Sequence, residues 1–153
     1  MPIVFLIVGI ILIDQLSKVY IQETMTVGMS LPIITDVFHI TYILNPGAAF
    51  GILENQRIFF IFIAIAMILV VAYIYPKIPS NSGFLRLGIA LLVGGAIGNV
   101  IDRAKSGYVV DFFDFRIWPI FNVADIGIVA GVTIIIYSMV FLSNIKDENN
   151  ESR

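Results

Sequence analysis

The sequence predicts an all-α membrane protein with four transmembrane helices and a small sheet outside the membrane. Of its 153 residues, 59% are hydrophobic and only 13% are charged, so the mean hydropathy reaches +0.97, well above that of a soluble domain. Four apolar stretches approach the ~20 residues that a helix needs to cross the hydrocarbon core. The polar residues inside these stretches gather near ends that face the same side of the membrane.

The first stretch is apolar except near its end, where Asp14, Gln15 and Lys18 lie. It has neither a basic start nor a small-residue cleavage site, so we expect a retained helix and not a removed signal peptide. The second stretch carries no charge, and a loop with two prolines separates it from the third. The spans are expected at 2–21, 58–75, 84–101 and 122–145, with the loop at 76–83, a polar tail at 146–153 and both termini on one side.

Two segments remain on the opposite side. Residues 22–57 are too long for a simple turn, and DVFHITYIL within them has strand-like composition, so we expect a small extramembrane sheet followed by the turn NPGAAFG. Residues 102–121 are rich in aromatic side chains and mixed in polarity, which is typical of a segment at the water–lipid boundary. Lysine and arginine are spread over both sides, so the positive-inside rule does not decide the orientation.

The composition excludes several classes of function. With a net charge of -2 and a pI near 5.2, the chain has no basic surface for a phosphate backbone, and we expect no nucleic-acid partner. The absence of cysteine excludes disulfides, thiolate metal sites and cysteine nucleophiles. His39 is the single histidine, so a multi-histidine metal cluster is excluded, and we expect no metal and no cofactor.

Ionisable residues near the ends of the spans are anomalous, because a charged group in a transmembrane helix costs roughly 2.5–3.5 kcal/mol at its centre. Together with nearby asparagines they fall into pairs spaced three or four residues apart, which places the two members of a pair on one helix face. All the pairs lie at span ends that face the same side, so they can converge on one site. The pairs are Asp14 with Lys18, Asn99 with Arg103, and Asn122 with Asp125.

Each of these pairs also has a structural interpretation. Asp14 and Lys18 have the acid first, the favourable order for a helix-end salt bridge, and a purely structural role is as plausible as a functional one. Asn99 is equally suited to hydrogen bonding between helices, with Arg103 extending to the lipid headgroups.

The third pair is, taken alone, best explained as a helix start, with Asn122 as N-cap and Asp125 in the first turn. His39 alternates with apolar neighbours in a predicted strand and is more typical of a surface or core histidine than of a catalyst. Small residues spaced four apart predict close helix packing, at Gly94 and Gly98 and at Gly127 and Gly131.

The stretch VVDFFDFRIW, residues 109–118, holds two further carboxylates among apolar and aromatic residues. In an extended chain the side chains alternate between faces, so Asp114 shares a face with Arg116, whereas Asp111 lies on an apolar face without a cation. A helical conformation would instead place both aspartates on one side. The extended interpretation makes Asp111 the more anomalous carboxylate.

If Asp111 approaches Asp125 at the membrane surface, the two cannot both ionise freely. Unit charges about 4 Å apart repel by roughly 4 kcal/mol at an effective dielectric near 20, so the pair shares one proton, as in aspartic proteases. Such a dyad needs no metal, thiol or histidine. A proton-coupled transporter is the rival interpretation, since buried acids also form proton relays, and a structural subunit built on the glycine pairs is a third.

Five sequence blocks occur in this order: DQLSK at 14–18, NPGAAFG at 45–51, GGAIGNVIDR at 94–103, VVDF at 109–112 and FNVAD at 121–125. Together they closely resemble lipoprotein signal peptidase, the signal peptidase II of bacteria. The match extends from the first span to the fourth, and five blocks in order are highly specific.

The resemblance implies four transmembrane helices, an extracytoplasmic β-cradle, a short interfacial amphipathic helix, cytoplasmic termini and an active site near the outer face of the bacterial membrane. It implies an aspartic endopeptidase that cleaves diacylglyceryl-modified prolipoproteins before the lipidated cysteine. Membrane lipids and inhibitory cyclic peptides of the globomycin type are further implied partners. The catalytic residues would be Asp111 and Asp125, and the supporting residues Asp14, Lys18, Asn45, Gly47, Asn99, Arg103 and Asn122.

Overall fold

A computed structural model describes residues 3–47 and 53–142 of the chain. They form four long helices and a three-stranded sheet. The elements in order are α1 (Ile3–Thr24), β1 (Ser30–Ile34), β2 (Phe38–Asn45), α2 (Arg57–Ile74) with the 3-10 turn η2 (Tyr75–Lys77), α3 (Gly83–Ser106), β3 (Val109–Asp114), and α4 (Val123–Tyr137) with the π-helical turn η3 (Ser138–Leu142).

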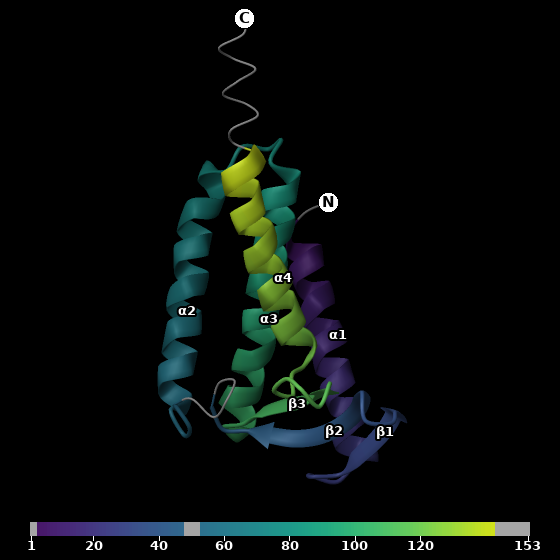
Figure 1. Ribbon diagram of the computed structural model, residues 1–153. Helices are drawn as coiled ribbons and strands as arrows, with labels where there is room; N and C mark the ends of the chain where they lie inside the picture. The colour runs from purple at the N-terminus through teal and green to yellow at the C-terminus, as the bar shows by residue number, and fades with distance from the viewer. Residues whose placement is uncertain (1–2, 48–52, 143–153) are drawn as a thin grey trace, which may run out of the picture.

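The four helices run side by side, and the sheet lies across one end of the bundle (Figure 1). The start of α1 and the end of α4 lie toward the opposite end. Helix α3 packs against each of the other three helices, whereas α2 has no buried residue. The predicted architecture of four apolar helices and a small sheet is confirmed.

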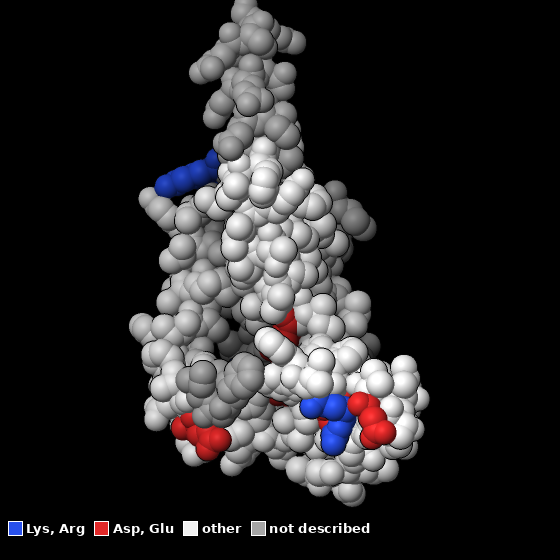
Figure 2. Space-filling view, in the orientation of Figure 1, with Lys and Arg blue, Asp and Glu red and all other residues white. Residues whose placement is uncertain are grey.

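Each of the four helices is long and apolar enough to cross a membrane: Ile3–Thr24, Arg57–Lys77, Gly83–Ser106 and Val123–Phe141. On the face shown in Figure 2, charged side chains gather at the sheet end of the bundle, one basic side chain lies toward the opposite end, and acidic atoms are visible in a recess above the sheet. The apolar sides of the helices suit contact with lipid, because a lipid environment imposes no cost on exposed aliphatic side chains.

The sheet is antiparallel in the order β1-β2-β3. Strand β3 comes from the segment expected at the membrane boundary, and it is extended rather than helical. In its pairing with β2, Asn45 lies opposite Val109 and Ile43 opposite Asp111. A buried cluster of Ile21, Tyr42, Val110 and Phe112 fixes the end of α1 against this sheet.

Glycines allow the helices to approach closely, as the small-residue spacing predicts. A Cβ atom added at Gly131 would lie 2.6 Å from the backbone oxygen of Gly88, and one at Gly94 would lie 2.9 Å from the Cβ of Ile10. Gly107 ends α3 with a φ of +87°, a left-handed conformation that glycine adopts without a steric penalty. This turn leads directly into β3.

The short amphipathic helix implied by the family resemblance is not seen among the described residues. Between β2 and α2 they form turns, and between β3 and α4 they form bends and an isolated bridge from Phe121 to Phe113. The described residues do not include 48–52, which cover the last four positions of the NPGAAFG block and the residue after it. They also do not include the expected tail at 146–153.

Candidate active site

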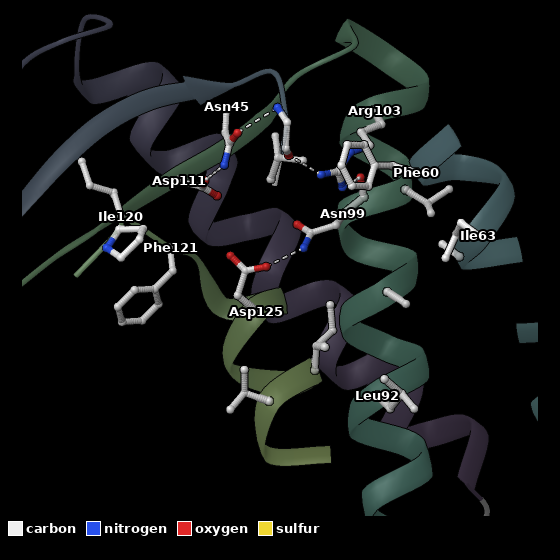
Figure 3. Close-up of a pocket in the computed structure, with 18 of the residues that line it drawn as sticks. Asn45, Phe60, Ile63, Leu92, Asn99, Arg103, Asp111, Ile120, Phe121 and Asp125 are labelled. Carbon is white, nitrogen blue, oxygen red and sulfur yellow. Dashed lines mark hydrogen bonds between the residues drawn. The ribbon is translucent and has the colours of Figure 1, made fainter. Parts of the chain in front are cut away.

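A pocket of about 470 Å³ opens where the sheet meets the helices. Both Asp111, from β3, and Asp125, from the first turn of α4, line it. Figure 3 shows Asn45 and Asn99 directed toward these two carboxylates. The structure therefore brings together the two aspartates that the sequence singled out, from positions separated by the turn between β3 and α4.

Asp111 is almost completely buried, with a relative exposure of 1%. Its two oxygens accept hydrogen bonds from the side-chain amides of Asn45 at 2.8 Å and Asn122 at 2.6 Å. Burial and the nearby charge of Asp125 raise the pKa of Asp111 to about 7, although the two amides and Lys18 oppose this rise. Asp111 is thus a carboxyl group that can exchange a proton near neutral pH.

Asp125 is fixed by the start of α4. Its Oδ2 accepts from the backbone N–H of Asn122 at 3.2 Å, and its own N–H donates to Asn122 Oδ1 at 2.9 Å. These reciprocal bonds form a capping box. The predicted N-cap is therefore confirmed, and the same Asn122 also donates to Asp111. The second oxygen, Oδ1, accepts from Asn99 Nδ2 at 2.8 Å.

Asn99 connects the dyad to a buried lysine. Its Oδ1 accepts from Lys18 Nζ at 3.0 Å and from Asn122 Nδ2 at 3.2 Å, while its amide nitrogen faces Asp125. Because the cation must face the amide oxygen, Lys18 fixes which way the Asn99 amide points. The expectation that Asn99 hydrogen-bonds between helices is confirmed, since it joins α1, α3 and α4.

Lys18 is itself only 2% exposed and lies between two carboxylates. Its Nζ is 2.9 Å from Asp14, one turn earlier in α1, and 2.9 Å from Asp102 of α3. The predicted Asp14–Lys18 salt bridge is confirmed, but it is a buried group of three charges rather than an isolated pair at a helix end.

Arg103 lies on the other side of the pocket. Its guanidinium donates to the backbone oxygen of Gly47 at 2.9 Å and lies 4.6 Å above the ring of Phe60. Asn45 Oδ1 accepts from the N–H of Gly47 at 2.9 Å. The start of the NPGAAFG block is therefore connected to α3 through Arg103 and to Asp111 through Asn45.

Asp114 differs from Asp111 as strand alternation predicts. Its carboxylate pairs with Arg116 at 2.9 Å and accepts from the Thr41 hydroxyl at 2.8 Å. Burial alone would raise the pKa of Asp114, but hydrogen bonds from the backbone N–H of Arg116, from Thr41 and from the Arg116 guanidinium hold this pKa below its usual value. Among residues 3–47 and 53–142, Asp111 forms no salt bridge. The side-chain amides of Asn45 and Asn122 contact its carboxylate instead.

The rest of the pocket wall is apolar and comes largely from the helices. This part extends from the two carboxylates along the space between α2 and the pair α3 and α4. It is lined by Phe60, Ile63, Ala64, Met67, Leu92, Ala96, Ile128 and Val129.

Such a lining suits hydrocarbon chains entering from a bilayer. Among the residues that the structure describes, no three His, Cys, Asp or Glu side chains are placed to hold a metal ion.

Two further residues of this site, Asp102 and Gln15, were not predicted from the sequence. Asp102 accepts hydrogen bonds from Gln15 Nε2 at 2.9 Å and from the N–H of Val110 at 3.2 Å. Asp102 lies three residues after Asn99, which places both side chains on one helix face. This spacing was the signal in the sequence from which Asp102 could have been identified. Gln15 also donates to Asp14 at 3.1 Å, and its place within the DQLSK block was the available signal.

His39, in contrast, takes no part in the site. It lies on β2 with its Nδ1 3.0 Å from the Ser30 hydroxyl, as expected for a surface or core histidine.

Most of the chain matches a known protein family. The family model described as "Signal peptidase (SPase) II" matches residues 6–141. The lipoprotein signal peptidase of Moorella thermoacetica is 45% identical over 139 residues, which cover 91% of this chain and 93% of that protein. The lipoprotein signal peptidase of Halothermothrix orenii is 51% identical over 127 residues, which cover 83% of this chain and 87% of that protein.

Solved structures give the same result for the fold. One, described as a bacterial membrane enzyme, superimposes with a TM-score of 0.84 at 37% identity and covers 97% of this chain and 90% of its own. A second structure with the same description gives a TM-score of 0.83, also at 37% identity, with coverage of 91% and 92%.

Proposed function

Because the chain belongs to the signal peptidase II family, we propose that it is an intramembrane aspartic endopeptidase whose catalytic dyad is Asp111 and Asp125. Its substrates are diacylglyceryl-modified prolipoproteins, and it cleaves on the N-terminal side of the lipidated cysteine. One observation supports this assignment above the others. The buried Asp111 and the half-buried Asp125 line one pocket, and the pKa of Asp111 lies near 7.

The chemistry follows from two carboxylates that share a proton. The ionised member draws a proton from a water molecule, and the protonated member donates to the oxygen of the scissile carbonyl. The water oxygen attacks the carbonyl carbon, and the amide nitrogen of the leaving cysteine takes up a proton as the bond breaks. The pair titrates as a unit, so the two roles belong to the dyad.

The amides around the dyad keep it in place during this reaction. Asn45, Asn99 and Asn122 each donate to a carboxylate oxygen, so the carboxyl groups meet a bound peptide already oriented. Arg103 and Gly47 lie beside them at the pocket wall, where they can hold the substrate backbone.

The apolar wall explains how a lipidated substrate is accommodated. The precursor diffuses laterally in the bilayer, its acyl chains remain against α2, α3 and α4, and its scissile peptide reaches the dyad at the end of the bundle. Both termini are cytoplasmic in this proposal, so the sheet and the dyad lie at the outer face of the bacterial membrane. Cyclic peptides of the globomycin type occupy the same pocket and block it.

A cleavage assay with defined substrates tests this function. Purified protein in detergent is incubated with one prolipoprotein peptide in two forms, with and without the diacylglyceryl group on its cysteine. We expect mass spectrometry to identify a single cut immediately before the cysteine, in the lipidated form alone, and a globomycin-type peptide to inhibit it. Equal cleavage of both forms would contradict the proposed substrate, and no cleavage of either would contradict the proposed activity.

A further inference from the structure

Asp102 is a buried carboxylate that the proposed mechanism does not use. It is 7% exposed and lies on α3, where its Oδ2 is shared by two donors. These are Lys18 Nζ at 2.9 Å and the backbone N–H of Val110 at 3.2 Å. A buried carboxylate is stabilised when all its oxygens are paired, and Gln15 Nε2 completes the set at Oδ1 with a distance of 2.9 Å.

Asp102 and Asp14 make equivalent contacts on the two sides of Lys18. Asp14 accepts from the backbone N–H of Ala124 at 2.9 Å, and Ala124 immediately precedes Asp125. Asp102 accepts from the N–H of Val110, which immediately precedes Asp111. Each carboxylate paired with Lys18 thus holds the backbone of one half of the dyad.

We propose that Asp102 is a positioning residue that fixes the geometry of the catalytic dyad. This inference rests on the proposed function. It acts on Asp111 through the backbone of Val110. It acts on Asp125 through Lys18, which orients the Asn99 amide that donates to Asp125 at 2.8 Å.

The negative charge of Asp102 is essential to this role. Removal of the charge leaves buried Lys18 with one carboxylate instead of two, and a buried ion that loses a partner reorganises its surroundings. The Asn99 amide and the start of β3 then lose their fixed positions together. A displacement of about 1 Å at reacting groups is enough to lower a rate about 100-fold.

The same change alters the electrostatic potential at the dyad. The charged groups that face Asp111 and Asp125 come from two helices. Loss of a negative charge beside Lys18 makes this potential more positive, which favours the ionised form of Asp111 and lowers its pKa. The facing groups are Asp14 and Lys18 of α1 and Arg103 of α3, and Asp102 lies beside Lys18.

Asp102→Asn is therefore assayed for kcat, KM and pH profile with the lipidated prolipoprotein peptide, together with its thermal stability in detergent. We expect kcat to fall about 10- to 100-fold, KM to change by less than about twofold, and the acid limb of the profile to move to lower pH. Asp114→Asn is the matched control, because Asp114 is buried in the same strand but pairs with Thr41 and Arg116.

Two further variants separate the possible outcomes. Asp102→Glu retains the charge, so we expect it to keep the wild-type pH profile with a reduced kcat, and it carries the test if Asp102→Asn does not fold. Wild-type kcat in Asp102→Glu would then overturn the proposal. Asp111→Asn reports on the proposed function itself, because cleavage by that variant would refute the dyad and leave Asp102 with nothing to position.

With Asp111→Asn inactive, a wild-type kcat and pH profile in Asp102→Asn would overturn the positioning role alone. A loss of kcat that only follows the loss of folded protein, with an unmoved pH profile, would also overturn it. A comparable fall of kcat and a comparable acid shift in Asp114→Asn would overturn it too.

Discussion

Asp111→Asn should make the folded protein more stable at neutral and alkaline pH. The usual pKa of an aspartate is 3.8, whereas burial and the charge of Asp125 raise the pKa of Asp111 to about 7 in the folded protein. The folded state therefore holds a proton that the unfolded state has already released between these two pH values. The contribution of Asp111 to the unfolding free energy is therefore fully present below pH 3.8 and is lost as the pH rises to about 7.

The size of the effect follows from the same two values. Their difference corresponds to about 4 kcal/mol of unfolding free energy, since each pKa unit is worth 1.36 kcal/mol. Asparagine is neutral like the protonated aspartate, but its NH2 group cannot accept a hydrogen bond, so one of the two bonds donated by the amides of Asn45 and Asn122 is lost. The cost of that lost bond is the same at every pH, so the variant lacks only the pH-dependent loss, and the slope of the difference curve reports on Asp111.

Thermal unfolding in detergent between pH 4 and 9 measures this difference. Subtraction of the wild-type curve from the variant curve cancels the groups that both proteins share. We expect the variant to gain stability progressively up to about pH 7 and then to hold a constant advantage. A flat difference curve, or one that falls with pH, would refute the account of Asp111.

Asp114→Asn provides a control of opposite sign. Burial alone would raise the pKa of Asp114, but the hydrogen bonds from Arg116 and Thr41 lower it overall. Asp114 therefore contributes stability above the unfolded pKa, and this contribution is lost as the pH falls through the folded pKa. We expect this variant to be less stable than the wild type at neutral pH and to approach it in acid.

Two further predictions concern packing and orientation. Gly131→Ala should lower the unfolding free energy by about 1–3 kcal/mol, because its Cβ would lie 2.6 Å from the backbone oxygen of Gly88. Gly9→Ala is the control, since an added Cβ there meets no atom within 4 Å, and equal thermal stability of the two variants would contradict the packing. The chain has no cysteine, so single cysteines at Lys77 and Glu54 can be labelled in cells without background. We expect an impermeant thiol reagent to label Glu54→Cys from outside and Lys77→Cys only after lysis, and the reverse pattern would contradict cytoplasmic termini.

Much of the architecture could be predicted because local patterns determine it. Helices that face lipid need long apolar runs, and these are visible in the sequence without any tertiary information. The capping box of Asn122 and Asp125 and the pair Asp14–Lys18 are likewise local, since their members are three or four residues apart. Strand alternation correctly separated Asp111 from Asp114.

The contacts that complete the site were not predictable in this way. Asn45 reaches Asp111 across 66 positions of the chain, and Asp14 reaches Ala124 across 110. Such contacts depend on how the helices pack and on the pairing of β3 with β2, which periodicity does not encode. The family resemblance identified Asn45 for that reason, whereas Asp102 needed the structure.

Cleavage of the lipidated prolipoprotein peptide by Asp111→Asn and Asp125→Asn, measured separately, tests the central claim most directly. Each variant removes one member of the pair that activates water and protonates the scissile carbonyl. We expect each to lower kcat by about 10²- to 10⁴-fold, while Asp114→Asn stays close to the wild type. Cleavage by either dyad variant at a rate within about tenfold of the wild type would contradict the claim that Asp111 and Asp125 are the catalytic groups.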